Sequence, residues 1–109
     1  MSRESIGEFE QLVLLAILRL GDDAYGVPIL DEIRMRTGRS VLRPAVYVAL
    51  RRLEAKKLVR SQTGEPTPER GGRARKFYRV EPAGLELLKD SRAALLNMWE
   101  GLQTVLDQR

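Results

Sequence analysis

The sequence contains no histidine and no cysteine among its 109 residues. Without them the chain cannot form a Ser-His-Asp or Cys-His catalytic site, or a zinc, haem or iron–sulfur centre held by these side chains. Disulfide bonds are excluded as well, so the composition gives no sign of an oxidising compartment. We therefore expect no metal and no cofactor, and an enzyme becomes the less favoured class.

Long hydrophobic runs are also missing. The longest, Leu12 to Leu18, is far shorter than the roughly 20 residues that a membrane-spanning helix requires. The first residues, Met1 to Glu4, lack the basic start and apolar stretch of a signal peptide. We expect a cytoplasmic protein without membrane contact, and the chain length allows one hydrophobic core.

Charge is distributed unevenly along the chain. The net charge is +4, but residues 39–80 hold 12 basic and 3 acidic side chains, a net charge of +9. Residues 1–38 carry a net charge of −3 and residues 81–109 a net charge of −2. A basic segment between acidic ones is typical of nucleic-acid-binding modules, although a solvated basic face without a partner has the same composition.

Hydrophobic spacing predicts three helices in the first half of the chain. Apolar residues recur at helical intervals between Phe9 and Leu20, and Gly21 then ends the first helix. A second helix is predicted over Tyr25 to Thr37 and a third from Pro44 to about Lys57. The first helix is apolar on two sides, which indicates that it packs against a second neighbour as well as its own core.

Two short strands follow, at Leu58 to Ser61 and Lys76 to Val80, joined by a loop rich in glycine and proline. This pattern predicts a β-hairpin with a long tip. A long helix is then predicted from Leu85 to about Asp107. Its apolar residues form a coiled-coil-like seam that we expect to bind a second copy of the chain. The seam consists of Leu88, Leu95, Met98, Leu102 and Val105.

The order helix, helix, helix, hairpin predicts a mostly α-helical protein with a small β-hairpin. The fold is a winged helix-turn-helix over residues 1–81, followed by a long C-terminal dimerisation helix over residues 82–109. In this fold the third helix enters the major groove of double-stranded DNA and the hairpin, or wing, approaches the backbone. The candidate DNA-contacting residues are Arg43, Tyr47, Arg51 and Arg52 on the third helix and Arg70, Arg73, Arg75 and Lys76 on the wing.

Three blocks of sequence carry a resemblance to a known family. They are Ala24-Tyr25-Gly26, the segment AVYVALRRLE at residues 45–54, and the segment GGRARKFYRVEPAG at residues 71–84. Over residues 8 to about 88 the chain resembles the PadR family of bacterial transcriptional regulators, in its short subfamily with a single C-terminal helix. The resemblance places Tyr47 and Arg51 on the recognition helix, and Gly71, Gly72, Arg73 and Lys76 on the wing.

The resemblance also implies an antiparallel homodimer that represses transcription from a roughly palindromic operator, and in some members a small aromatic effector that releases the DNA. Two positions depart from the family pattern. Arg43-Pro44 stands where small polar residues commonly begin the recognition helix, so a base preference cannot be transferred. Lys57 replaces a usual glycine after that helix.

The single tryptophan, Trp99, lies beside the predicted seam. Two such indoles facing each other across a dimer would form a slot for a planar aromatic effector, lined further by Met98 and by Leu15 and Leu18 of the first helix. Short PadR-like regulators with a tryptophan in this helix bind flat compounds there. The alternative is that Trp99 only fills the dimer core, because an interface aromatic needs no ligand.

Two other classes of function fit the sequence less well. A winged helix can bind protein instead of DNA, but an acidic or apolar third helix would then be expected, and Arg51 and Arg52 oppose it. An enzyme would have to rely on the carboxylates of Asp22, Asp23, Asp31 and Glu32. Helix capping and solubility explain these acidic residues better.

Overall fold

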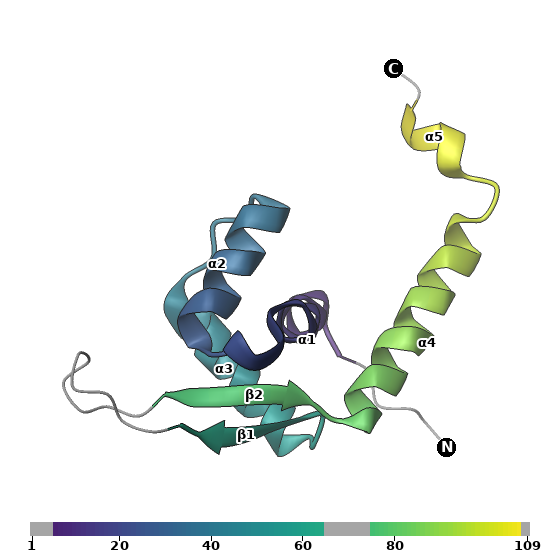
Figure 1. Cartoon of the computed structure of the whole chain (residues 1–109). Helices are drawn as coiled ribbons and strands as arrows, with labels where there is room; N and C mark the ends of the chain where they lie inside the picture. Colours follow the sequence, from purple (N-terminus) through teal and green to yellow (C-terminus); the bar gives the residue numbers. More distant parts are fainter. Residues whose placement is uncertain (1–5, 65–74, 108–109) are drawn as a thin grey trace.

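A computed structural model describes residues 6–64 and 75–107 of the chain (Figure 1). The predicted order of three helices, a hairpin and a C-terminal helical region is confirmed. The elements are α1 (Glu8–Leu20), the 3-10 turn η1 (Gly21–Asp23), α2 (Gly26–Thr37), α3 (Arg43–Ala55), β1 (Val59–Thr63), β2 (Lys76–Val80), α4 (Pro82–Trp99) and α5 (Gln103–Asp107).

The core lies where α1, α2 and α3 meet. Each helix contributes one apolar face, and Leu14, Ile29 and Leu50 are among the side chains that are fully buried. The hairpin covers this core from one side with Val59 and Tyr78. No buried side chain among the described residues is charged, so burial of apolar surface supplies most of the stability.

The connection between α2 and α3 is held by one arginine. Gly38, with a φ of 68°, ends α2 in the left-handed conformation that glycine adopts easily. The guanidinium of Arg34 then donates two hydrogen bonds to the Val41 carbonyl, at 3.0 and 2.7 Å. These bonds hold the chain directly before α3 and so help to set the direction of that helix.

The turn after α3 requires a conformation that glycine usually supplies. Lys57 has a φ of 63° and is the only non-glycine residue with a positive φ in the described chain. The Leu58 amide donates to the Leu53 carbonyl at 2.9 Å, and the Lys57 amide donates to Glu54 at 3.0 Å, which is the Schellman pattern of helix ends. Lys57, which stands where the resemblance leads us to expect glycine, therefore adopts a left-handed conformation at a cost of about 1–2 kcal/mol.

The two strands pair antiparallel, with Val59 opposite Val80 and Ser61 opposite Tyr78. Strand β1 continues to Thr63, two residues beyond the predicted end. Side chains alternate between the two faces, so that Val59 and Tyr78 face the core and Arg60 and Arg79 face away. One face of the hairpin thus covers the helical core, and the other face carries Arg60 and Arg79.

The C-terminal region differs from the single helix predicted over Leu85 to Asp107, and that prediction is wrong. Helix α4 begins earlier, at Pro82, and ends at Trp99. Glu100 and Gly101 then form a type II turn, in which the Leu102 amide donates to the Trp99 carbonyl at 2.8 Å. Such a turn needs a positive φ at its third residue, and Gly101 has a φ of 83°. The short helix α5 follows in a new direction (Figure 1).

The start of α4 is fastened to the body of the molecule and its end is not. A Cβ atom on Gly84 would lie only 2.5 Å from the carbonyl oxygen of Leu58, so α4 begins in direct contact with the residue that precedes β1. Leu88, predicted to lack a partner within its own domain, packs instead against the core of its own chain. From residue 92 onward the side chains are exposed; we call residues 92–107 the C-terminal arm.

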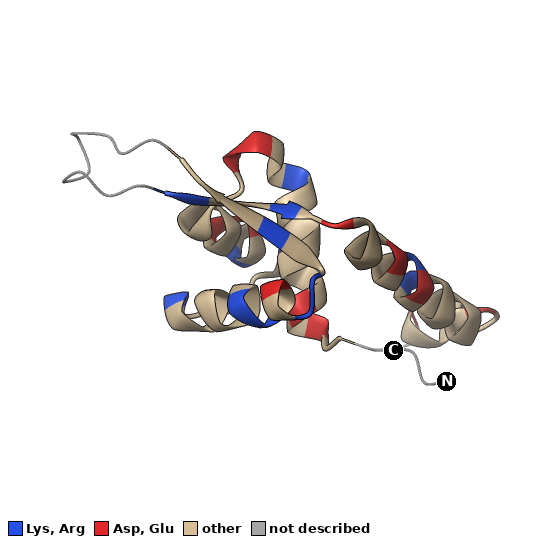
Figure 2. Ribbon diagram, turned by 90° about the horizontal axis from the view of Figure 1, so that it is seen from below, with Lys and Arg blue, Asp and Glu red and all other residues tan. Residues whose placement is uncertain are grey.

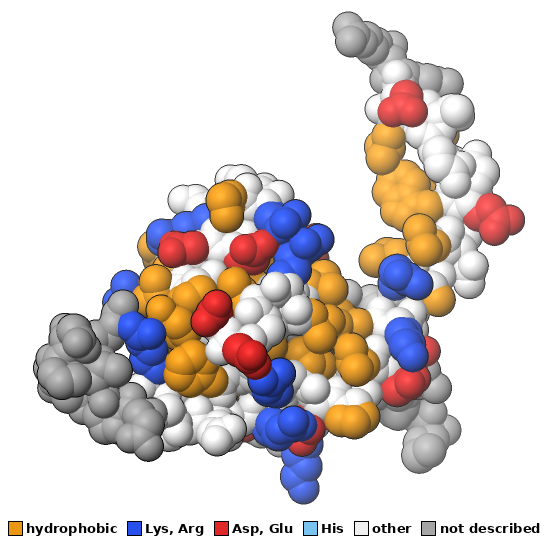
Figure 3. Space-filling view, viewed as in Figure 1, with side chains coloured by type: hydrophobic (Ala, Val, Ile, Leu, Met, Phe, Trp, Pro, Cys, Tyr) orange, Lys and Arg blue, Asp and Glu red, His pale blue; other side chains and the backbone are white. Residues whose placement is uncertain are grey.

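The arm carries apolar residues that nothing in one chain covers. Figure 3 shows them gathered on the side of the arm that faces the rest of the molecule. The exposed apolar residues of the arm are Leu95, Leu96, Met98, Trp99, Leu102, Val105 and Leu106. Despite this apolar content, no helix of the described residues is long and apolar enough to span a membrane.

Candidate nucleic-acid interface

The face that α3 turns to solvent follows from the positions that it buries. Val46, Ala49, Leu50 and Leu53 are buried, and at 3.6 residues per turn the opposite side of the helix is occupied by residues 44, 48, 51 and 55. Arg51 therefore lies close to the centre of the exposed face. Arg43 and Arg52 are exposed on its two flanks.

The arginines of α3 are available to a ligand. No ion pair joins Arg43, Arg51 or Arg52 to another residue in the described part of the chain. Other arginines do have carboxylate partners, such as Arg39, whose guanidinium lies 2.7 Å from Glu8. Because Arg can bond a guanine edge or a phosphate in bidentate fashion, three unpaired copies on one helix favour a polyanionic partner.

Tyr47 belongs partly to the core structure. Its ring packs against Gly26 at the start of α2, where an added Cβ would lie 2.6 Å from the ring atom Cζ. The side chain keeps about a third of its surface exposed. Tyr47 therefore faces the junction of α2 and α3, and only its free part can contact DNA.

The side of α3 nearest the hairpin surrounds a second tyrosine. Burial raises the pKa of the Tyr78 hydroxyl above its ordinary value, and Glu54 and Tyr47 raise it further, whereas the Arg51 guanidinium lowers it. The phenol is therefore protonated at neutral pH. Tyr47, Arg51 and Glu54 of α3 are thus near enough to this hydroxyl group to influence it.

Two predicted wing residues help to hold the hairpin in place. The Arg75 guanidinium lies 4.5 Å from the centroid of the Tyr25 ring, and Phe77 meets the same ring edge-on at 5.3 Å. The Lys76 ammonium lies 3.5 Å from a carboxylate oxygen of Glu54 on α3. Both cations thus have partners within the protein, which the charge count alone did not indicate. Arg70, Gly71, Gly72 and Arg73 lie outside the described residues.

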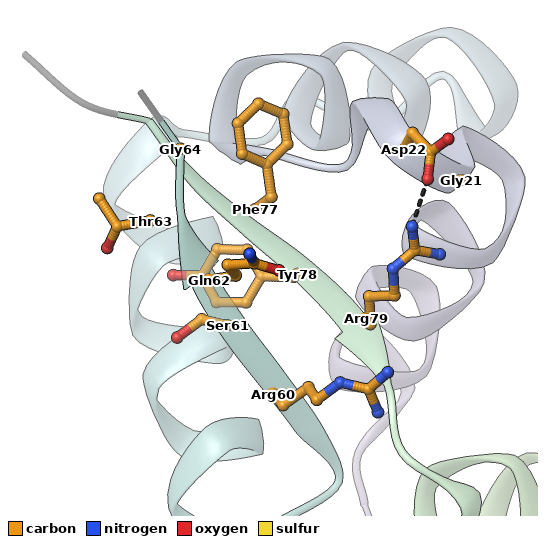
Figure 4. Close-up of a pocket in the computed structure, with 10 residues that line it drawn as sticks. All are labelled: Gly21, Asp22, Arg60, Ser61, Gln62, Thr63, Gly64, Phe77, Tyr78 and Arg79. Atoms are coloured by element: carbon orange, nitrogen blue, oxygen red, sulfur yellow. Dashed lines mark hydrogen bonds and ion pairs between the residues drawn. The ribbon is translucent and has the colours of Figure 1, made fainter. Parts of the chain in front are cut away.

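The outer face of the hairpin forms a shallow hollow of 460 Å³ together with η1 (Figure 4). Arg60 and Arg79 lie directly opposite each other in this face. Arg60 is paired with Glu81 at 2.6 Å, and Arg79 is paired with Asp22. Figure 2 shows basic residues on the strands with the acidic turn beside them. The charges of this hollow are balanced, and Asp22 serves as a partner for the wing.

The first turn of α1 contacts the segments at both ends of α3. Glu8 pairs with Arg39 before α3, and Glu10 pairs with Lys56 after it, at 3.1 Å. In the next position Gln11 accepts a hydrogen bond of 2.9 Å from Ser91 of α4. Sequence reasoning did not find these contacts, because long-range pairs between polar residues leave no local pattern.

The four residues predicted to bind an effector are exposed but do not come together within one chain. Leu15 and Leu18 lie on the outer side of α1, whereas Met98 and Trp99 lie at the end of α4, which projects away from the body (Figure 1). Trp99 is 40% exposed. A site that includes all four would need a second chain.

Comparison with known proteins decides the family. The model of the transcriptional regulator PadR-like family matches residues 14–90, which is more than half of the chain. The chain belongs to the PadR-like family. As a PadR-like protein it is a DNA-binding transcriptional regulator with a winged-helix fold, and not an enzyme. No protein of curated function matches the sequence closely enough to count as a relative.

Solved structures agree with this assignment. A transcriptional regulator from Clostridium thermocellum is 27% identical, over 90% of this chain and 88% of its own, with a TM-score of 0.66. A PadR family regulator from Clostridium difficile is 25% identical, over 92% and 96%, with a TM-score of 0.65. One from Eggerthella lenta is 26% identical, over 94% and 88%, with a TM-score of 0.68. This PadR-like chain is thus similar to them over nearly its whole length.

Proposed function

We propose that two copies of this PadR-like protein form a homodimer that represses transcription by occupying a roughly palindromic operator. Helix α3 of each copy enters the major groove of one half-site, and the wing approaches the backbone. The observation that carries the proposal is the set of three exposed arginines on α3 that have no ion pair among the described residues. Arg51 is the candidate for base recognition. Arg43 and Arg52 are the candidates for contacts with the DNA on either side of that base.

The C-terminal arm supports the proposal of a homodimer. Seven apolar side chains of the arm are exposed in one chain, and soluble monomers rarely leave so large an apolar patch uncovered. A two-fold dimer would cover this patch with the same patch of the second copy. It would also present two α3 helices to half-sites about one helical turn apart.

The first test is the salt dependence of DNA binding. DNA fragments selected from a random pool by the purified protein should bind it in a fluorescence anisotropy titration, and the affinity should fall steeply with salt. If a dimer contacts about 6 phosphates, log K should decrease with log salt at a slope near −5, because bound cations are released from the DNA. Affinity that does not change with salt, or a failure to select any sequence, would favour the alternative of a protein-binding winged helix.

A second part of the proposal concerns a small planar aromatic effector. In a dimer, Trp99 and Met98 of one chain could meet Leu15 and Leu18 of the other around a slot that an aromatic ring fills by stacking. Binding of the effector would shift the dimer away from the form that fits the operator. The fluorescence of Trp99 is well suited to report binding of the effector, because the chain has no other tryptophan.

The effector site predicts saturable quenching of the intrinsic fluorescence. Titration with a panel of planar cationic and neutral aromatics should quench Trp99, and the same compounds should weaken operator binding over the same concentration range. Trp99→Ala is expected to abolish the effect of these compounds on DNA binding. If no compound in a broad panel acts, and Trp99→Ala only lowers the stability of the dimer, Trp99 is a structural residue of the interface.

A further inference from the structure

The centre of the exposed face of α3 is apolar. Val48 is 36% exposed although it lies in the middle of the helix. Its neighbours on this face are Pro44, one turn earlier, and Ala55, two turns later, and both are exposed. Val48 thus lies between Pro44 and Ala55 in an apolar strip, on a helix face that also carries Arg51.

The surroundings of Val48 leave its outer surface free. On one side it borders a hollow of 380 Å³ between α3 and the first turn of α1, which Phe9, Ala45 and Arg52 also line. On the other side is Arg51, the residue that we expect to contact a base. Being β-branched, Val48 holds its two methyl groups in nearly one orientation on the helix. The result is a rigid apolar surface beside a hydrogen-bonding one.

In the major groove the C5-methyl group of thymine is the apolar feature that distinguishes base pairs, and apolar side chains recognise it by contact. Residues three apart on a helix have Cβ atoms about 5–6 Å apart, which is one to two steps of 3.4 Å along a DNA strand. Val48 and Arg51 are therefore spaced to contact neighbouring or next-neighbouring bases.

We infer that Val48 reads the methyl group of a thymine in each half-site of the operator, within two base pairs of the base contacted by Arg51. The inference rests on the proposed function and adds to it one determinant of base preference. The ligand is a thymine C5-methyl group, and the recognition is contact between that methyl group and the methyl groups of Val48. Discrimination against cytosine or uracil at this position follows from the missing methyl group.

The experiment removes this methyl group alone. In an operator selected by the wild-type protein, each thymine is replaced in turn by uracil, symmetrically in both half-sites, and affinity is measured by anisotropy at fixed salt. At one thymine position the replacement should weaken binding about fourfold for each half-site, or about 16-fold for the dimer, as expected for one methyl group returned to water. Uracil at the other positions should have little effect.

Two variants assign the effect to Val48. Val48→Ala should bind the thymine operator more weakly than the wild-type protein does. It should bind the thymine and the uracil operator with equal affinity, because its contact with the methyl group is already lost. Met35→Ala serves as the matched control, since Met35 is an exposed apolar residue on α2 and not on α3, and it should keep the full preference for thymine. Thermal unfolding of both variants checks that the fold is intact.

The outcomes separate this inference from the proposed function. Sequence-selective binding without any uracil-sensitive position would overturn the inference and leave the proposed function standing. Val48→Ala with an undiminished preference for thymine would do the same, and would assign Val48 to the wall of the hollow beside α1. A protein that selects no DNA sequence at all would overturn both.

Discussion

The Leu95→Glu variant should sediment as a monomer and bind a two-half-site operator at least about 100-fold more weakly than the wild-type protein. Leu95 is 56% exposed in one chain and is the first of the large exposed apolar residues of the C-terminal arm. In the proposed dimer this position is buried, and a buried carboxylate without a partner is costly. Once the dimer dissociates, each α3 binds its half-site alone, and the advantage of linked sites, about 10²- to 10⁴-fold, is lost.

Met35→Glu is the control for this experiment. Met35 is 76% exposed on α2, outside the arm, and its replacement changes the net charge of the chain by the same amount. This variant should remain a dimer and lose only the small electrostatic part of its affinity. Sedimentation velocity gives the oligomeric state, and anisotropy gives the affinity at the same salt concentration. A Leu95→Glu protein that remains dimeric would show that the arm is not the dimer interface.

The Arg51→Ala variant should lose about 1–3 kcal/mol of binding free energy for each half-site and should distinguish operator from unrelated DNA less well. Arg51 lies near the centre of the exposed face of α3 and has no carboxylate partner among the described residues. A bidentate contact to a base edge is lost with the side chain, and alanine supplies no replacement. Affinities for the operator and for a scrambled sequence, measured side by side, give the change in selectivity.

Arg19→Ala removes the same charge from a different place. Arg19 is exposed in the last turn of α1 and has no ion pair among the described residues. The variant should weaken binding to all sequences slightly and equally, because it alters only the overall field of the protein. If Arg19→Ala and Arg51→Ala gave the same loss on operator and scrambled DNA, Arg51 would be assigned to the phosphate backbone.

The helices and strands of the winged helix could be predicted because their signals are local. Apolar spacing, Gly21 and Gly38 mark the first two helices, and a loop rich in glycine and proline between two short segments marks the hairpin. The break at Gly101 was missed because an apolar period continued on both sides of it. Helix propensity disfavours glycine by only about 1 kcal/mol, so one glycine within a strong apolar pattern does not predict a turn.

The kinds of residue in the candidate site can be inferred from the sequence. How these residues are arranged can be inferred less well. Counting charges gives Arg51 and Lys76 equal standing as candidate DNA-contacting residues. In the structure Lys76 forms an ion pair with Glu54, a contact that depends on how the hairpin packs on α3. Val48 was overlooked because a valine within an apolar pattern is normally assigned to the core. Its exposure follows from the exact rotation of α3, which the packing of Val46 and Leu50 determines.

The contact between Gly26 and Tyr47 links two positions that are distant in the sequence. The space that a side chain at position 26 would need is filled by the ring of Tyr47. A side chain at position 26 therefore requires that the ring of Tyr47 move or that a smaller residue replace it. Because Tyr47 belongs to α3, such a substitution on α2 would alter the surface of the helix that we propose to contact DNA. A change of operator preference is then expected from a substitution that itself contacts no base.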